Sequence, residues 1–155
     1  MAMAAKRMKE QAKLADELGT LIGRARRLVY YAAERRLERH GESMFTYLLL
    51  KHAVQRGGAS QTKLAQLTAQ HAAAVSRAID ELESRGLVER ARDADDRRRV
   101  RVEATAEGRA LFRAMHPEVV GGVDGALGRL DASERLALRA LLDKLVGDGE
   151  PTDRD

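Results

Sequence analysis

Three consecutive arginines, Arg97, Arg98 and Arg99, follow three acidic residues within residues 93–99. Guanidinium groups are planar, stay charged and donate paired hydrogen bonds, so they suit phosphates and other polyanions. A charged run of this kind is also found in solvated turns, where acids and arginines cancel one another. The elements that present the run decide between these two interpretations.

Two predicted helices precede the arginines. Ser60 is suited to cap a short helix from Gln61 to about Leu67, and a cap near Gln70 or His71 opens a second helix that ends at Ser84. Apolar side chains of the second helix recur at helical spacing and form an inner stripe, which consists of Val75, Ala78, Ile79 and Leu82. Ala73 and Arg77 face away from this stripe.

A short hairpin follows Gly86. The segment LVER (residues 87–90) and the segment VRV (residues 100–102) predict two strands joined by a turn over residues 91–99, so the three arginines fall at the tip. Thr105 then predicts the start of another helix, with Glu107 near its positive end.

Longer helices flank these elements. Apolar spacing predicts one helix over residues 3–40, either broken near Gly19, which we favour, or using Gly19 and Gly23 for close helix approach. A second helix is expected over Met44–Val54, and a leucine-rich one runs from a cap at Asp131 to about Val146. Between them, Pro117 and the stretch GGVDGALG (residues 121–128) predict an interrupted, kinked or loosely structured helix. The apolar stripe of the first helix either docks on its own core or, as we favour, forms a dimer seam.

This order of elements is that of a winged helix-turn-helix, a mainly α fold with a small β-hairpin wing. Residues 24–145 resemble the MarR family (multiple antibiotic resistance regulators). Four ordered motifs carry the resemblance, namely Val75-Ser76-Arg77, Gly86-Leu87-Val88, Asp96-Arg97-Arg98 and Thr105-Ala106-Glu107-Gly108. The sequence departs from the family pattern at Ala104, where leucine is usual, at Ala69, which replaces a frequent turn glycine, and in the alanine run of residues 72–74.

The resemblance implies a transcriptional regulator, more often a repressor, that binds double-stranded DNA as a homodimer on a pseudo-palindromic operator. It implies dimerisation helices in residues 1–42 and 105–147 and a DNA-binding domain in residues 43–104. The polar composition of residues 148–155 predicts a disordered tail. The expected DNA contacts are Ser60, Gln61, Thr62, Gln70, His71, Ala73, Ser76, Arg77, Arg97, Arg98 and Arg99. Arg98 is expected in the minor groove and Asp96 is expected to orient it. For Arg77 the alternative is an intrahelical pair with Glu81.

Many members of the family release DNA when a small, often aromatic and anionic, molecule occupies the cleft between the dimerisation helices and the DNA-binding lobe. Such an effector is therefore expected here as well. Residues on the first two helices are the candidates for lining the cleft, and they are Arg27, Tyr30, Tyr31, His40, Phe45, Tyr47 and His52.

Composition excludes several classes of function. The 155 residues contain no cysteine, which rules out disulfides, thiolate metal sites and thiol nucleophiles, and the net charge of +4 is mild. The four histidines lack metal-hydrolase spacing and no serine has a nucleophile-elbow context, so we expect neither an enzyme nor a cofactor or metal. No apolar run approaches membrane-spanning length, and a cytoplasmic protein is expected. A winged helix that binds protein instead of DNA, and a metal-responsive repressor, stay open as alternatives.

Overall fold

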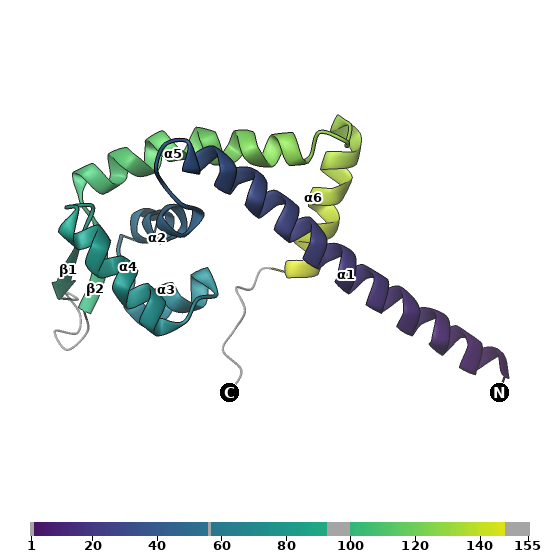
Figure 1. Ribbon diagram of the computed structural model, residues 1–155. Helices are drawn as coiled ribbons and strands as arrows, with labels where there is room; N and C mark the ends of the chain where they lie inside the picture. Colours follow the sequence, from purple (N-terminus) through teal and green to yellow (C-terminus); the bar gives the residue numbers. More distant parts are fainter. Residues whose placement is uncertain (1, 56, 93–99, 148–155) are drawn as a thin grey trace.

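The computed structural model describes residues 2–55, 57–92 and 100–147, and it has the expected mainly α architecture with one antiparallel hairpin (Figure 1). The helices are α1 (Ala2–Glu38), α2 (Met44–Gln55), α3 (Gln61–Thr68), α4 (Ala72–Ser84), α5 (Ala106–Ala126) and α6 (Ala132–Val146), and the strands are β1 (Val88–Arg92) and β2 (Val100–Ala104). The winged helix-turn-helix order predicted from the sequence is thereby confirmed.

The core lies where α2, α3, α4 and β2 meet the C-terminal end of α1 and the body of α5. Its largest fully buried side chains come from five of these elements, and they are Leu37, Leu49, Leu50, Leu64, Val75, Ile79 and Val102. The predicted inner stripe of α4 supplies two of them. Because burial of one such side chain contributes roughly 1.5–3 kcal/mol, this cluster dominates the stability of the lobe around it.

Three predicted helix starts are confirmed by their caps. The Ser60 hydroxyl accepts a hydrogen bond from the backbone N–H of Lys63 at 3.1 Å, and the Thr105 hydroxyl accepts one from Gly108 at 3.0 Å. Asp131 forms a reciprocal capping box with Glu134, each side chain accepting from the other residue's backbone N–H. These side chains satisfy amides that a helix start leaves without an intrahelical partner.

The predicted break near Gly19 is wrong, because α1 is one helix of 37 residues. A glycine inside a helix costs only about 1 kcal/mol relative to alanine, and the neighbouring Ala, Leu, Lys and Glu residues are strong helix formers. A β-carbon added at Gly19 would meet nothing within 4 Å. The N-terminal half of α1 therefore continues straight out from the rest of the chain (Figure 1).

The predicted interruption of the fifth helix is also wrong. α5 runs without a break from Ala106 to Ala126 through Pro117 and both glycines of the pair. The glycines serve a helix crossing instead, because a β-carbon on Gly122 would lie 2.6 Å from the Cα of Ala33 in α1. Close approach of α1 and α5 therefore requires glycine at this position.

The hairpin pairs Val88 with Ala104 and Arg92 with Val100, so both strands are longer than predicted and β1 begins one residue after Leu87. Ala104 is only 5% exposed. The alanine that stands in place of the family's usual leucine is therefore packed within the fold.

Candidate nucleic-acid interface

The turn between α3 and α4 determines the angle between the two helices. Ala69 adopts a left-handed conformation with φ of 52°, and the N–H of Gln70 donates to the carbonyl of Ala65 at 3.1 Å. This conformation disfavours any residue with a β-carbon, which explains the frequent glycine at this place in the family pattern. The turn leaves Gln70 and His71 exposed, with His71 as the N-cap residue of α4.

The two faces of α4 differ as the sequence predicts. Val75, Ile79 and Leu82 are buried, whereas Ala73 and Arg77 are exposed and Ser76 is half-buried. At the start of α3, Ser60 and Thr62 are exposed and Gln61 is half-buried. The predicted contact residues that the structure describes thus lie at the starts of two helices joined by a three-residue turn.

The acidic residues of α4 are paired with arginines outside its first turns. Arg90 of β1 donates to Asp80 at 2.5 Å and also to Glu83, and the hydrogen bond to Asp80 raises the pKa of Arg90. Glu81 lies 3.8 Å from Arg85 in an i,i+4 ion pair. The alternative pairing of Arg77 with Glu81 is therefore not formed, and within the described residues Arg77 makes no ion pair.

The base of the wing is attached to the segment that leads into α3. Ala59 and Val102 exchange two backbone hydrogen bonds, of 3.0 and 2.8 Å, and Arg101 donates to the carbonyl of Gly58 at 2.7 Å. The hairpin is thereby held beside the helix-turn-helix. The predicted residues of its tip, Asp96, Arg97, Arg98 and Arg99, lie outside the described residues.

Several of the predicted effector residues have partners within the chain. Tyr47 is buried, its ring stacks on Phe112 with a centroid separation of 5.5 Å, and its hydroxyl lies 2.9 Å from Nδ1 of His116. Burial raises the pKa of Tyr47. His40 lies 3.6 Å from Glu118 of α5.

The remaining candidates are spread over α1 and α2. Tyr30 and Tyr31 contact each other edge to face, with centroids 5.8 Å apart, and burial raises the pKa of Tyr30. Arg27 is exposed and His52 is half-buried. Phe45 is the one of the seven that lines the cavity between α1 and α4.

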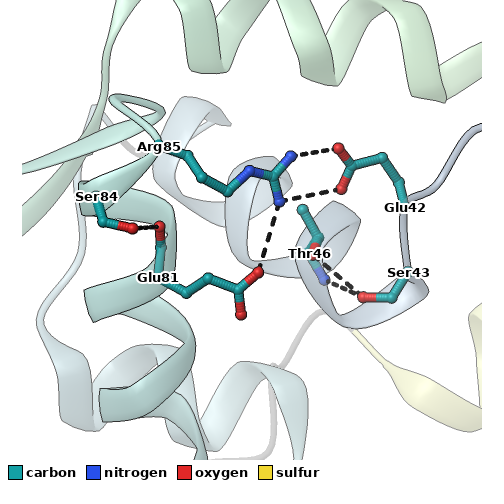
Figure 2. Close-up of polar contacts among 6 residues, drawn as sticks. All are labelled: Glu42, Ser43, Thr46, Glu81, Ser84 and Arg85. Carbon is teal, nitrogen blue, oxygen red and sulfur yellow. Dashed lines mark hydrogen bonds and ion pairs between the residues drawn. The ribbon is translucent and has the colours of Figure 1, made fainter.

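This cavity has a volume of about 430 Å³ and lies between the C-terminal end of α1, residues 41–43, the start of α2 and the C-terminal half of α4. Phe45, Ala78 and Leu82 form its apolar wall. Arg85 and Glu42 form an ion pair at its edge (Figure 2). Sequence reasoning did not single out either residue, since 43 positions separate them and only the i,i+4 spacing of Glu81 and Arg85 could have been noticed.

The part of the chain that the structure covers includes no helix both long and apolar enough to cross a membrane. It also holds no group of three or more histidine or acidic side chains placed to bind a metal ion.

An exposed second helix after a tight turn, followed by a hairpin fastened beside it, defines a winged helix-turn-helix. A model of the MarR family matches residues 43–100. The transcriptional regulator HosA of Escherichia coli is 31% identical over 100 residues, which cover 64% of this chain and 74% of HosA. The chain therefore belongs to the MarR family of winged-helix transcriptional regulators.

Two other relatives share the fold or the matched stretch. The transcriptional repressor NicR of Pseudomonas putida is 37% identical over 94 residues, and the match spans 61% of this chain and 60% of NicR. A structure of Bordetella bronchiseptica BpsR, whose DNA binding is regulated by 6-hydroxynicotinic acid, superposes with a TM-score of 0.70. It is 28% identical and covers 85% of this chain and 94% of BpsR.

Proposed function

We propose that two copies of this chain bind a pseudo-palindromic operator in duplex DNA, repress transcription there and leave the operator when a small molecule binds. In this proposal residues 43–104 bind DNA, and residues 1–42 and 105–147 form the dimer. The chain acts without catalysis and without a cofactor.

The observation that carries the proposal is the state of the outer face of α4. Arg77 is exposed at the surface of a helix whose opposite face is buried, and it makes no ion pair within the described residues. The nearby carboxylates Asp80 and Glu83 are held by Arg90, which reduces the repulsion they would exert on phosphates. The major groove admits one helix, and an arginine there can form a bidentate pair with guanine.

The other predicted contacts complete a DNA-binding face. The exposed Ser60 and Thr62 lie at the positive end of α3, where backbone amides favour a phosphate. Arg98 enters the minor groove beside α4, the recognition helix, with Asp96 orienting it, because narrow minor grooves attract guanidinium groups. Arg97 and Arg99 contact phosphates.

Dimerisation is supported by apolar side chains that the single chain leaves uncovered. Leu18, Leu21 and Leu28 of α1 are 48–59% exposed. None of the described residues of α6 is buried, and its Leu136, Leu141 and Leu145 are each at least 65% exposed. Exposed apolar surface of this extent is characteristic of a protein interface. A two-fold dimer presents its two α4 helices to half-sites about 10 base pairs apart.

Release by a small molecule is supported by the cavity between α1 and α4. Its volume of about 430 Å³ falls in the range of ligand pockets, roughly 300–1,000 Å³. It also contacts α4 directly through Ala78 and Leu82, so an occupant would act on the recognition helix.

Titration of labelled DNA from upstream of the chain's own coding sequence tests the proposal. We expect a specific complex of two chains per site, weakening steeply with salt, and Arg77→Ala should lose about 1–3 kcal/mol of binding free energy for the preferred sequence. Lys13→Ala removes one positive charge from a side chain that is 79% exposed on the face of α1 opposite the apolar stripe, so it should leave binding unchanged. Absence of any sequence-specific complex at low salt would favour a winged helix that binds protein.

A further inference from the structure

The cavity between α1 and α4 carries an excess of negative charge. Its lining includes four carboxylates, those of Glu34, Glu38, Glu42 and Glu81, and a single guanidinium, that of Arg85. The other lining side chains are apolar or hydroxyl-bearing. A ligand that enters therefore meets three more negative than positive charges.

The guanidinium of Arg85 is already engaged by two of these carboxylates. It donates twice to Glu42, once at 3.4 Å and once at closer range, and it lies 3.8 Å from Glu81 (Figure 2). The Glu42 side chain is only 9% exposed. An anionic ligand would have to take Arg85 away from Glu42 and leave a nearly buried carboxylate without its partner, which is costly.

A cation meets the opposite situation. Glu38 is exposed at the rim of the cavity, and Glu42 and Glu81 can exchange Arg85 for another positive group without either carboxylate losing its counter-charge. Glu34 is occupied otherwise, because its carboxylate accepts the N–H of Met44 at 2.5 Å. The ring of Phe45 provides an apolar wall that also attracts cations through its π face.

Because of the position of Arg85, a cation that displaces it would change how the end of α4 is held. Arg85 is the C-cap residue of α4, and Glu42 belongs to the connection between α1 and α2. Their ion pair thus ties the end of the recognition helix to the end of the long helix α1 (Figure 2). A group that replaces Arg85 beside Glu42 releases this tie.

We infer that the effector of this cavity is a small organic cation, an amine on an apolar or aromatic body, which competes with Arg85 for Glu42 and Glu81 and so frees the end of α4. The inference rests on the proposed function, since it names the ligand class of the same regulated site. It departs from BpsR, whose regulating compound is an acid.

Two probes of matched shape and opposite charge test the inference on the full chain. Calorimetric titration with 2-phenylethylamine should show binding at neutral pH and low salt, whereas 3-phenylpropanoate should show none. The amine should also release operator DNA in a competition assay, and the acid should not. Binding of the acid in preference to the amine, equal binding of both, or binding of neither at millimolar concentration overturns the inference.

Charge variants locate the binding in this cavity. Glu38→Gln and Glu81→Gln should each weaken amine binding by roughly three- to fivefold, the effect of removing one unit charge about 5 Å away in a solvent-filled cleft. Arg85→Gln should strengthen it, because a competing cation is lost. Glu17→Gln, on the exposed part of α1, is the charge-matched control and should change nothing. Unaltered amine binding in both glutamate variants would contradict the assignment.

DNA binding without any compound separates the two proposals. Sequence-specific binding that the amine does not affect leaves the proposed regulator standing and overturns the inference about its ligand. An acid that binds in the cavity and releases DNA has the same meaning. Amine binding that responds to the charge variants in a chain without specific DNA binding supports the ligand class and overturns the regulator.

Discussion

The winged lobe, which consists of α2, α3, α4 and the hairpin, differs from the flanking helices α1 and α6 in how far its side chains are buried. In the lobe, α2, α3 and α4 enclose side chains such as Leu50, Leu64 and Ile79 that have no exposed surface, and caps and ion pairs within the same lobe hold its surface. In contrast, α6 buries none of its described residues, and α1 over residues 6–22 is exposed throughout. The lobe buries its own apolar side chains, whereas α6 and residues 6–22 of α1 leave theirs exposed.

This difference separates two kinds of contribution to stability. A substitution in the lobe core changes the free energy of unfolding of the chain itself. In the proposed dimer, a substitution in the apolar stripe of α1 or α6 weakens association instead, so its effect on the apparent stability depends on protein concentration.

The largest expected effect comes from the lobe core. Ile79→Ala should lower the free energy of unfolding by about 2–5 kcal/mol, because it removes fully buried methyl groups and leaves a cavity. Leu145→Ala, at a position 65% exposed, should lower the unfolding midpoint only by weakening association in the proposed dimer, so its effect should vary with protein concentration. Urea unfolding over a range of protein concentrations measures both. An equal, concentration-independent loss in the two variants would remove the distinction between lobe and helices.

The next effect concerns the crossing where α1 meets the body of the chain. Gly122→Ala should lower the free energy of unfolding by about 1–3 kcal/mol, because the new methyl group meets backbone atoms of Ala32 and Ala33 that cannot move aside alone. Gly125→Ala, one turn further along α5, meets nothing within 4 Å and should be neutral or stabilising in thermal unfolding of the isolated chain. If the two variants unfolded alike, the crossing would not depend on glycine.

A smaller gain is expected at the turn within the lobe. Ala69→Gly should raise the free energy of unfolding by about 0.5–1 kcal/mol, because glycine adopts the left-handed conformation without steric cost. Ala65→Gly, inside α3, should lower it by about 1 kcal/mol. Denaturant unfolding of both variants gives the sign directly, and a loss at Ala69→Gly would show that the turn is not strained.

The sequence predicted the structure of the lobe better than that of the flanking helices. Local signals were sufficient for the lobe, because a cap such as Ser60 and an apolar stripe such as Val75, Ile79 and Leu82 involve only residues close together in the sequence. They failed at Gly19 and at Gly121-Gly122, where glycine was interpreted as a break. At Gly122 the reason is tertiary, since only the close approach of α1 explains it.

The candidate site shows the same limit. Exposure of Ala73 and Arg77 was predictable from helical spacing. The cavity was not, because the contact between Glu42 and Arg85 joins residues far apart in the chain. The family resemblance implied a cleft, and aromatic residues on α1 and α2 were candidates for lining it. The partner of Tyr47 is His116 of α5, which no pattern in α2 could indicate.

The smallest expected effect lies at the start of α6, where the helix is stabilised by its cap without burial. The backbone N–H of Glu134 donates to Asp131 and lowers the pKa of that carboxyl below its ordinary value of 3.8. The folded-state pKa is the lower one, so this stabilisation is present above pH 3.8 and is lost as the pH falls through the lowered pKa. Asp131→Asn keeps a capping side chain that does not titrate. The difference in stability between this variant and the native chain should therefore shrink as the pH falls. Thermal unfolding across acidic pH, together with NMR titration of the Asp131 carboxyl, measures this, and a stability difference that stays constant with pH would mean that the charge of Asp131 contributes nothing to the cap.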